Sequence, residues 1–417
     1  MLKNLENNLA NKMFTDLSSD FPLIRFKGFN QTWKTEQISD LFQTYKNKNS
    51  NNLKLISYSV SNKLGFVSQK QLFKNGGKAI FADKSNSQII TKNTFGFNPT
   101  AIQTGSLALY KNSTPGLISP MYKAFKLKKD YNYDYFLIWF RTEIFKKLML
   151  KSTNKSVRNI FRLNQIEKYF IKVADIAEQE KISQLFETFE NLVNKLEEKI
   201  QILKDLKNNL TKKMFTDLSS DFPLIRFKGF NQTWKTEQIS DLFQTYKNKN
   251  SNNLKLISYS VSNKLGFVSQ KQLFKNGGKA IFADKSNSQI ITKNTFAFNP
   301  SRIQVGSLAL YKNSTPGLIS PMYKAFKLKK DYNYDYFLIW FRTEIFKKLM
   351  LKSTNKSVRN IFRLNEIEEY FIKVADTVEQ QKISQLFETF DSLILAYEQK
   401  VGYFQKIKKT LLNEMFI

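Results

Sequence analysis

Two hydrophobic patterns divide the chain into regions of different predicted structure. In the first, apolar and polar residues alternate, and a period of two predicts short strands. This pattern occupies 53–62 (LKLISYSVSN), 80–95, 106–112 and 121–129. Turn residues such as Gly76–Gly77 separate these segments, as expected between strands. We therefore expect a strand-rich region in this part of the chain.

The second pattern is helical. Neither Gly nor Pro occurs from Met121 to Phe222, and 130–150 predicts an amphipathic or buried helix. Further on, apolar residues recur in heptads, which predicts a coiled-coil seam interrupted at Lys199 and Lys400. A helix packed on its own domain would give the same pattern, but two such helices favour mutual pairing. The predicted seam is Ile182, Leu185, Phe189, Leu192, Leu196, Leu203, Leu206, Leu210, Ile383, Leu386, Phe390, Leu393, Tyr397, Phe404, Ile407 and Leu411.

The chain contains one unit twice. Residues 13–173 match residues 214–374 at an offset of 201, with six differences in 161 positions. The opening segment 2–12 also matches 203–213. The order of these segments resembles a circular arrangement opened at one point, and we expect its two ends to lie together.

These patterns predict a mixed α/β fold class. We expect two α/β globular domains separated by two long helices that form an antiparallel coiled coil, in a pseudo-twofold, circular arrangement. The predicted parts are an N-terminal helix tail (1–13), a first globular domain (14–172), a central helix (173–215), a second globular domain (216–373) and a C-terminal helix (374–417).

Charge and composition narrow the function. Sixty-six Lys and Arg against 35 Asp and Glu give a net charge of +31, which favours nucleic acid over a membrane surface or an acidic partner. A compositional bias toward Lys, Asn and Phe is a second explanation of that charge. The absence of Cys and His excludes disulfides, thiolate metal sites and histidine-based catalysis. No apolar stretch suits a membrane span or a signal peptide, so we expect a cytoplasmic protein.

Three stretches resemble the specificity subunits of type I restriction–modification systems. FPLIRFKGFNQTWKTEQISDLFQ at 21–43, repeated at 222–244, resembles the beginning of a target recognition domain. GSLALYKNSTPGLISPMYKAFKL at 105–127 resembles the middle of that domain. The stretch that starts IEKYFIKVADIAEQEKISQLF at 166 resembles its last strand and the long helix that follows. The resemblance covers nearly the whole chain, twice and in the same order.

The resemblance implies a DNA-reading subunit that is not a catalyst. Its two target recognition domains would each bind one half of a bipartite, gapped target in double-stranded DNA. Its helices would dock two methyltransferase subunits, which use S-adenosylmethionine to methylate adenine, and motor-nuclease restriction subunits would join where they are present. The chain itself is expected to hold no cofactor and no metal. Near-identical domains related by a twofold axis should read an interrupted palindrome.

Candidate DNA-binding residues lie in the loops and turns of the globular domains. Lys and Arg suit phosphate, and Asn, Gln and Ser suit base edges, although each of these residues could equally be ordinary solvated surface. The candidates are Lys63, Gln69, Lys70, Gln71, Lys78, Lys84, Asn86, Lys111, Asn112, Ser113, Lys155, Arg158, Lys264, Gln270, Lys271, Gln272, Lys279, Lys285, Asn287, Arg302, Lys312, Asn313, Ser314, Lys356 and Arg359.

One difference between the repeats bears on specificity. Four of the six differences lie in 96–104, where Ala101 of the first copy answers Arg302 of the second. If Arg302 contacts a guanine or a phosphate, the two half-sites differ at one position or the first copy binds more weakly. If Arg302 is only a surface residue, the half-sites are the same.

Two other functions fit the sequence less well. A sequence-specific repressor or architectural protein could also carry paired DNA-reading domains, but it would need no methyltransferase. A coiled-coil scaffold with a compositional charge would bind no duplex even at low salt.

Overall fold

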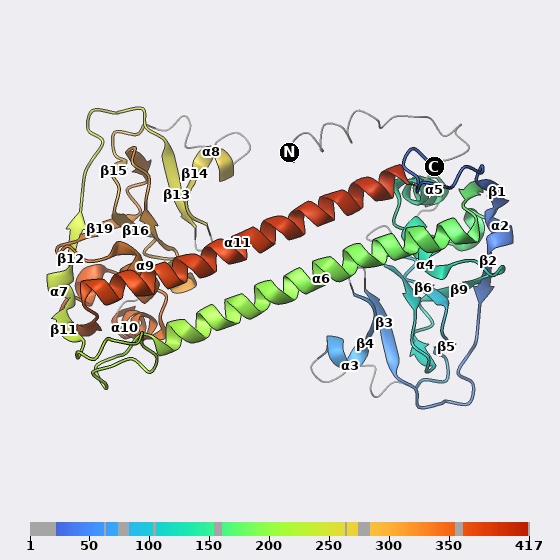
Figure 1. Cartoon of the computed structure of the whole chain (residues 1–417), viewed down its shortest axis with the longest axis horizontal. Coiled ribbons are helices and arrows are strands. Elements are labelled where there is room, and N and C mark those ends of the chain that lie inside the picture. The colour runs from blue at the N-terminus through green and yellow to red at the C-terminus, as the bar shows by residue number, and fades with distance from the viewer. Residues whose placement is uncertain are drawn as a thin grey trace. The chain divides into compact units, whose positions relative to one another are not determined.

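The computed structural model divides the chain into two compact units. Unit 1 is Met1–Leu196 with Gln399–Ile417, and unit 2 is Glu197–Glu398. The long helices α6 (Ile176–Lys213) and α11 (Thr377–Glu414) therefore each contribute to both units (Figure 1). The predicted helix tail at 1–13 lies outside the residues that the structure describes, which are 22–61, 64–73, 83–102, 106–153, 161–262, 265–273, 284–354 and 362–415.

The main core of unit 1 lies between a four-stranded antiparallel sheet and two helices. The sheet order is β2-β9-β6-β7. Phe95 and Phe125 on adjacent strands stack with their ring centroids 4.9 Å apart, and Phe42 and Phe140 meet the same cluster edge-on or tilted. Large buried aromatic side chains dominate this core. The elements are β2 (Phe42–Tyr45), β6 (Thr94–Phe97), β7 (Leu107–Tyr110), β9 (Lys123–Leu127), α4 (Tyr133–Trp139) and α5 (Glu143–Thr153).

The predicted single helix at 130–150 is two helices, α4 and α5. The Thr142 hydroxyl donates to the Trp139 carbonyl at 2.7 Å and accepts from the Phe145 amide at 3.3 Å. A threonine in this position terminates one helix and caps the next. The resulting bend places Trp139 and Phe145 in the same core, 5.3 Å apart between ring centroids.

A second four-stranded sheet, in the order β4-β3-β8-β5, forms a smaller core in unit 1. Strands β3 and β8 are parallel, and the other pairs are antiparallel. A Cβ at Gly116 would lie 2.7 Å from the Tyr58 ring and 2.8 Å from the Tyr110 hydroxyl, so only glycine fits there. The elements are β3 (Ser57–Ser61), β4 (Gly65–Ser68), α3 (Gln69–Leu72), β5 (Gln88–Ile90) and β8 (Gly116–Ile118).

A two-stranded sheet joins the beginning and the end of the globular part of unit 1. Strand β1 (Lys34–Gln37) pairs antiparallel with β10 (Phe170–Val173), and the short helix α2 (Ile38–Leu41) leads from β1 into β2. Helix α6 follows β10 within three residues. The leading segment of the unit and the start of the long helix are therefore neighbours.

Unit 2 repeats every one of these elements. Its sheets have the orders β12-β19-β16-β17, β14-β13-β18-β15 and β11-β20. The predicted mixed α/β class, with two repeated domains and long helices, is confirmed. The elements are β11 (Lys235–Gln238), α7 (Ile239–Leu242), β12 (Phe243–Tyr246), β13 (Ser258–Ser262), β14 (Gly266–Ser269), α8 (Gln270–Leu273), β15 (Gln289–Ile291), β16 (Thr295–Phe298), β17 (Leu308–Tyr311), β18 (Gly317–Ile319), β19 (Lys324–Leu328), α9 (Tyr334–Trp340), α10 (Glu344–Thr354) and β20 (Phe371–Val374).

Within each unit the start of one long helix pairs antiparallel with the end of the other. In unit 1, the rings of Phe189 and Phe404 lie 6.2 Å apart, and Lys408 donates to Glu190 at 2.5 Å. In unit 2, Lys204 donates to Glu398 at 2.7 Å and Lys207 pairs with Asp391. Higher residue numbers on one helix meet lower numbers on the other, as an antiparallel pair requires. None of the described helices combines the length and the apolar character needed to cross a membrane.

Part of the predicted seam was wrong by one residue. Three leucines of the predicted seam, Leu192, Leu206 and Leu393, are 41%, 45% and 43% exposed. The buried residues occupy the next position of the heptad: Ile200 and Ile394 are each 8% exposed. Leucines flank the seam on both sides, so sequence alone did not separate the two spacings. Leu185, Leu386 and Ile407 are half-buried beside it. The observed seam is Ile182, Phe186, Phe189, Val193, Leu196, Ile200, Leu203, Lys207 and Leu210 on α6 with Met214 just after it, and Ile383, Phe387, Phe390, Ile394, Tyr397, Val401, Phe404, Lys408 and Leu411 on α11 with Met415 just after it.

Candidate nucleic-acid interface

Strand β3 of unit 1 carries a row of serines on its half-exposed face. Ser57, Ser59 and Ser61 alternate with buried Tyr58 and Val60. The buried face packs on the smaller core, where Tyr58 meets the Tyr110 ring at 5.3 Å. Hydroxyl groups on a rigid strand can donate to phosphate or to base edges. We call Ser57, Ser59 and Ser61 the serine row.

Lys84 joins the serine row from the loop before β5. Its ammonium donates to Ser57 Oγ at 2.6 Å. The preceding Asp83 accepts from the backbone amide and the hydroxyl of Ser85 at 2.9 and 2.6 Å, and these bonds lower the pKa of Asp83. The turn fixes the loop that carries Lys84 and the exposed Asn86.

Gln69 reaches the serine row from the first turn of α3. Its Nε2 donates to Ser59 Oγ in a long bond of 3.4 Å. Its Oε1 is buried and has no hydrogen-bond partner within the described residues, and Oε1 of Gln270 is in the same state in unit 2. Unsatisfied buried acceptors are rare in proteins, so this amide keeps hydrogen-bonding capacity for a ligand or water. Lys70 and Gln71 are exposed on the same helix.

Asn112 contacts the opposite side of β3. Its Nδ2 donates to the Tyr58 hydroxyl at 3.1 Å. The neighbouring Tyr110 hydroxyl donates to the Thr114 carbonyl at 2.8 Å, and burial raises the pKa of Tyr110 to about 12, so its hydroxyl stays protonated. Asn112 thus lies on the tyrosine side of β3, apart from Lys84 and Gln69, and the neighbouring Ser113 is exposed.

Unit 2 reproduces this arrangement with nearly the same distances. Lys285 donates to Ser258 Oγ at 2.8 Å, Gln270 to Ser260 Oγ at 3.5 Å, and Asn313 to the Tyr259 hydroxyl at 3.2 Å. The further candidates in unit 2 that are exposed are Lys271, Gln272, Asn287 and Ser314.

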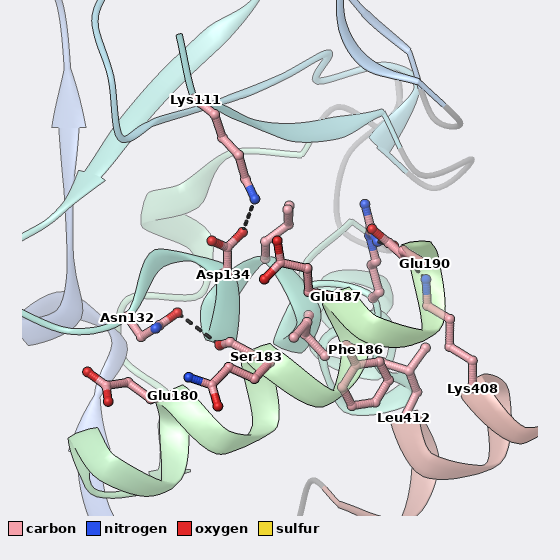
Figure 2. A pocket seen from close by; sticks show the side chains of 14 residues that line it. Lys111, Asn132, Asp134, Glu180, Ser183, Phe186, Glu187, Glu190, Lys408 and Leu412 are labelled. Carbon is pink, nitrogen blue, oxygen red and sulfur yellow. Dashed lines mark hydrogen bonds and ion pairs between the residues drawn. The ribbon is translucent and has the colours of Figure 1, made fainter. Parts of the chain in front are cut away.

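Lys111 does not belong to this group. It pairs with Asp134 at 2.6 Å, as Lys312 does with Asp335 in unit 2. Figure 2 shows this ion pair at the edge of a pocket formed by α4, α6 and the end of α11. An existing carboxylate partner makes both lysines weaker candidates for phosphate.

Arg302 lies at the start of a 3-10 helix, Ile303–Val305, and is exposed. Its backbone amide donates to the Asn299 carbonyl at 3.0 Å. The guanidinium is thus presented from a fixed turn, and its role in DNA contact stays a prediction. Eight candidates lie outside the described residues: Lys63, Lys78, Lys155, Arg158, Lys264, Lys279, Lys356 and Arg359.

Two features of the interface escaped the sequence prediction. The serine row was visible in the alternation SYSVS, but only the strand pairing shows that lysine and glutamine side chains converge on it. The second feature is Lys126 on β9, which donates to Thr91 Oγ1 at 2.8 Å and lies 4.6 Å from the centre of the Tyr45 ring. In unit 2, Lys327 makes the equivalent contacts with Thr292 and Tyr246. Within the described residues, no group of three or more acidic side chains is placed to hold a metal ion.

Solved structures share this arrangement of elements. The S subunit of a type I restriction–modification system from M. genitalium aligns with a TM-score of 0.57 at 12% identity, over 95% of this chain and 99% of that one. The chain has the fold of a type I specificity subunit. A second structure, from work on complex assembly and conformational transition of the type I system, aligns with a TM-score of 0.55 at 12% identity, over 91% of this chain and 96% of that one. No family model matches the sequence, and no curated protein sequence does.

The two serine rows lie in the two repeated globular parts of this specificity-subunit fold. Both aligned chains are covered almost completely, so the likeness extends over both units and both long helices. At 12% identity the likeness concerns the fold alone.

Proposed function

We propose that this chain is the DNA-specificity subunit of a type I restriction–modification complex and is not itself a catalyst. The observation that carries the proposal is the repeated convergence of a lysine, a glutamine and a serine row on one strand in each unit. A net charge of +31 supports the same conclusion, since it favours binding to a polyanion. The specificity-subunit fold supports it further. In this proposal the chain acts in the cytoplasm.

Each unit would read one half of a bipartite target in double-stranded DNA. Lys84 and Lys70 would contact phosphate, while Asn86 and Gln71 would contact base edges. The repeats differ at six of 161 positions, so both units should read nearly the same half-site. The proposed target is an interrupted palindrome.

The proposed partners supply the chemistry that this chain lacks. Two methyltransferase subunits would dock on the long helices, bring S-adenosylmethionine and methylate adenine, and restriction subunits would join where they are present. The chain contains no His and no Cys, and a subunit that only recognises DNA needs no catalytic side chain of either kind.

The decisive experiment is methylation mapping. The chain is co-expressed with its methyltransferase subunit in a host that lacks other adenine methylation, and the genome is sequenced by a single-molecule method. We expect methylation at a gapped palindromic motif that is lost when the chain is omitted. Binding of the purified chain to duplex DNA without any methyltransferase association would instead favour a repressor.

Arg302 provides a test of the difference between the two units. If its guanidinium reads a base, Arg302→Ala should make the two half-sites of the methylated motif alike. An unchanged motif would show that Arg302 reads no base.

A further inference from the structure

The positive charge is concentrated in one part of each unit. Residues 41–129 contain 14 Lys and one acidic residue, Asp83, and residues 242–330 contain 15 Lys and Arg and one acidic residue, Asp284. These two segments make up less than half of the chain but carry 27 of its 31 net positive charges. A compositional bias shared by the whole chain does not explain this uneven distribution. The segments form the two four-stranded sheets of each unit, so this part of the molecule should attract a polyanion.

One loop in this part of unit 1 is fixed by a buried asparagine. Residues 46–54 connect β2 to β3 (Figure 1), and Asn49 within them is 0% exposed. Its Nδ2 donates to the carbonyls of Leu53 and Lys84 at 3.1 and 3.2 Å, and its Oδ1 accepts from the Leu53 amide at 2.9 Å. The backbone amide of Asn49 donates to the Ser87 carbonyl at 2.9 Å. A buried amide group with all its partners in place holds its surroundings rigidly. We call residues 46–54 the Asn49 loop.

The Asn49 loop is joined by its backbone to the turn before β5. The Ile89 amide donates to the Asn47 carbonyl at 2.7 Å. Hydrogen bonds within the turn lower the pKa of Asp83 most, and the charge of Lys48 lowers it further, so Lys48 lies near this turn. The same turn carries Lys84, which contacts the serine row. The loop and the turn therefore lie side by side.

The polar side chains that the Asn49 loop exposes suit a duplex. The Asn52 amide donates to the Asn49 carbonyl at 2.8 Å, and Asn52 has a φ of 47°, which places Asn51 in a tight turn. Within the described residues, none of the three lysines of the loop forms a salt bridge. Ammonium groups suit phosphate, and an amide suits the edge of a base. The exposed polar residues are Lys46, Asn47, Lys48, Ser50, Asn51, Asn52 and Lys54.

Unit 2 builds the same loop at 247–255, where the sequence is identical. Asn250 is 0% exposed, donates to the carbonyls of Leu254 and Lys285 at 3.1 Å each, and accepts from the Leu254 amide at 2.9 Å. Asn253 has a φ of 47°, as its counterpart in unit 1 has. Both units should therefore use this loop in the same way.

We propose that the Asn49 loop is a DNA-contacting element in which Lys48 contacts phosphate and Asn51 contacts a base edge, while Asn49 positions both. This role rests on the proposed function, because it takes double-stranded DNA as the partner. Asn49 is fully buried and does not reach the duplex itself. It fixes the loop relative to Lys84, so the two lysines approach the phosphate backbone with a set spacing. A loop that is rigid before binding loses little conformational entropy when it binds.

The test uses the full-length chain in complex with its methyltransferase subunit. Fluorescence anisotropy measures its affinity for a duplex that carries the methylated motif and for a shuffled duplex of the same composition. Lys48→Ala with Lys249→Ala should weaken binding to both duplexes and reduce the slope of log K against log salt by about two. Lys34→Ala with Lys235→Ala, which removes one exposed lysine each from β1 and β11, is the control and should leave this slope unchanged.

The base contact is tested with a matched pair of asparagine variants. Asn51→Ala with Asn252→Ala should lower the affinity for the motif by about tenfold or more and leave the affinity for the shuffled duplex unchanged, because an amide–base contact discriminates between sequences. Asn30→Ala with Asn231→Ala removes exposed asparagines that precede β1 and β11 and should change neither affinity.

The positioning role of Asn49 is tested by a double-mutant cycle. Asn49→Ala with Asn250→Ala should lower the affinity for the motif and leave that for the shuffled duplex unchanged. Adding Asn51→Ala and Asn252→Ala should then cost little more, because residues that act through one contact are not additive. A purely structural role would reduce the amount of active protein and leave the ratio of the two affinities unchanged.

The outcomes separate this role from the proposed function. A wild-type complex that binds both duplexes equally contradicts the proposed function and the loop's role with it. If the wild type prefers the motif, but the Lys48 variant or the Asn51 variant behaves like its control, the proposal for the loop is overturned and the function stands. Additive losses from Asn49 and Asn51 would overturn the positioning role.

Discussion

Arg25 holds Glu178 through two hydrogen bonds, from Nε to Oε1 at 2.7 Å and from Nη2 to Oε2 at 2.8 Å. Trp33 Nε1 donates to the same carboxylate at 2.8 Å, and the Glu178 side chain is only 1% exposed. Asp175 accepts from the Glu178 amide at 2.8 Å, which caps the first turn of α6. The hydrogen bond that Arg25 donates to Glu178 raises the pKa of Arg25. This cluster fastens the long helix to the leading segment of unit 1.

Removing one partner of this buried pair should destabilise unit 1 strongly. Glu178→Ala leaves the guanidinium and the indole N–H without their acceptor, and such losses cost about 3–5 kcal/mol. Thermal and urea unfolding would measure the cost. Glu379→Ala should have a similar effect in unit 2, where Arg226 and Trp234 hold the carboxylate in the same way. Glu143→Ala, which removes an exposed pair with Lys146, is the control and should change stability little. Equal effects of Glu178→Ala and Glu143→Ala would contradict the assignment.

The corrected seam predicts opposite outcomes for two neighbouring apolar residues. Ile200→Ala removes a side chain that is 8% exposed and should cost about 2–4 kcal/mol. Leu206→Ala removes one that is 45% exposed and should cost less than about 1 kcal/mol. Urea unfolding of the two variants would check both values. A larger loss for Leu206→Ala would restore the heptad spacing first predicted from the sequence.

Two glycines of unit 1 should respond differently to alanine. A Cβ at Gly96 would lie 2.6 Å from the tip of the Phe66 ring, yet unit 2 carries Ala297 at the same position, so the ring can move. Gly116→Ala would press on the Tyr58 ring and the Tyr110 hydroxyl at once, in a core that has glycine in both units. We expect about 1–3 kcal/mol for Gly116→Ala and less for Gly96→Ala. Melting temperatures would rank the two variants, and the reverse order would refute the packing argument.

Glu36 should make stability depend on pH. Burial alone would raise the pKa of Glu36, but hydrogen bonds from Lys129 and Tyr131 outweigh burial and leave that pKa lowered. A lowered folded-state pKa stabilises the protein above the unfolded value of about 4.3, and this contribution disappears as the pH falls through the folded-state pKa. The difference in unfolding free energy between the wild type and Glu36→Gln should therefore shrink between about pH 5 and pH 3. A difference that stays constant over this range would contradict the role of the charge.

DNA-binding experiments should distinguish the residues that contact phosphate from those that contact bases. The double variant Lys70→Ala with Lys271→Ala removes one exposed cation from each unit and should reduce the slope of log K against log salt by about two. Asn86→Ala with Asn287→Ala should leave this slope unchanged and relax the methylated motif. Fluorescence anisotropy and methylation sequencing would measure the two effects. A changed salt slope for the asparagine pair would assign those residues to the phosphate backbone.

The sequence predicted the architecture better than the site. Heptads and alternation were sufficient for the fold class because they reflect burial along single elements. The break at Thr142 was missed because a threonine cap inside an apolar run has no distinctive pattern. The convergence of Lys84 and Gln69 on Ser57 and Ser59 depends on strand pairing across tens of residues, which periodicity does not contain. The seam error at Leu192 arose because leucine occupies both the buried and the flanking positions.

The closure of unit 1 by α11 has a consequence for synthesis on the ribosome. Unit 2 is one continuous segment, from Glu197 to Glu398. Unit 1 is not continuous, because its Phe189 ring contacts Phe404, which lies 215 positions later in the chain. Domains generally fold as they emerge, at about 5–20 residues per second. For roughly ten seconds or more at such rates, the nascent first domain would expose an apolar groove whose final partner does not yet exist.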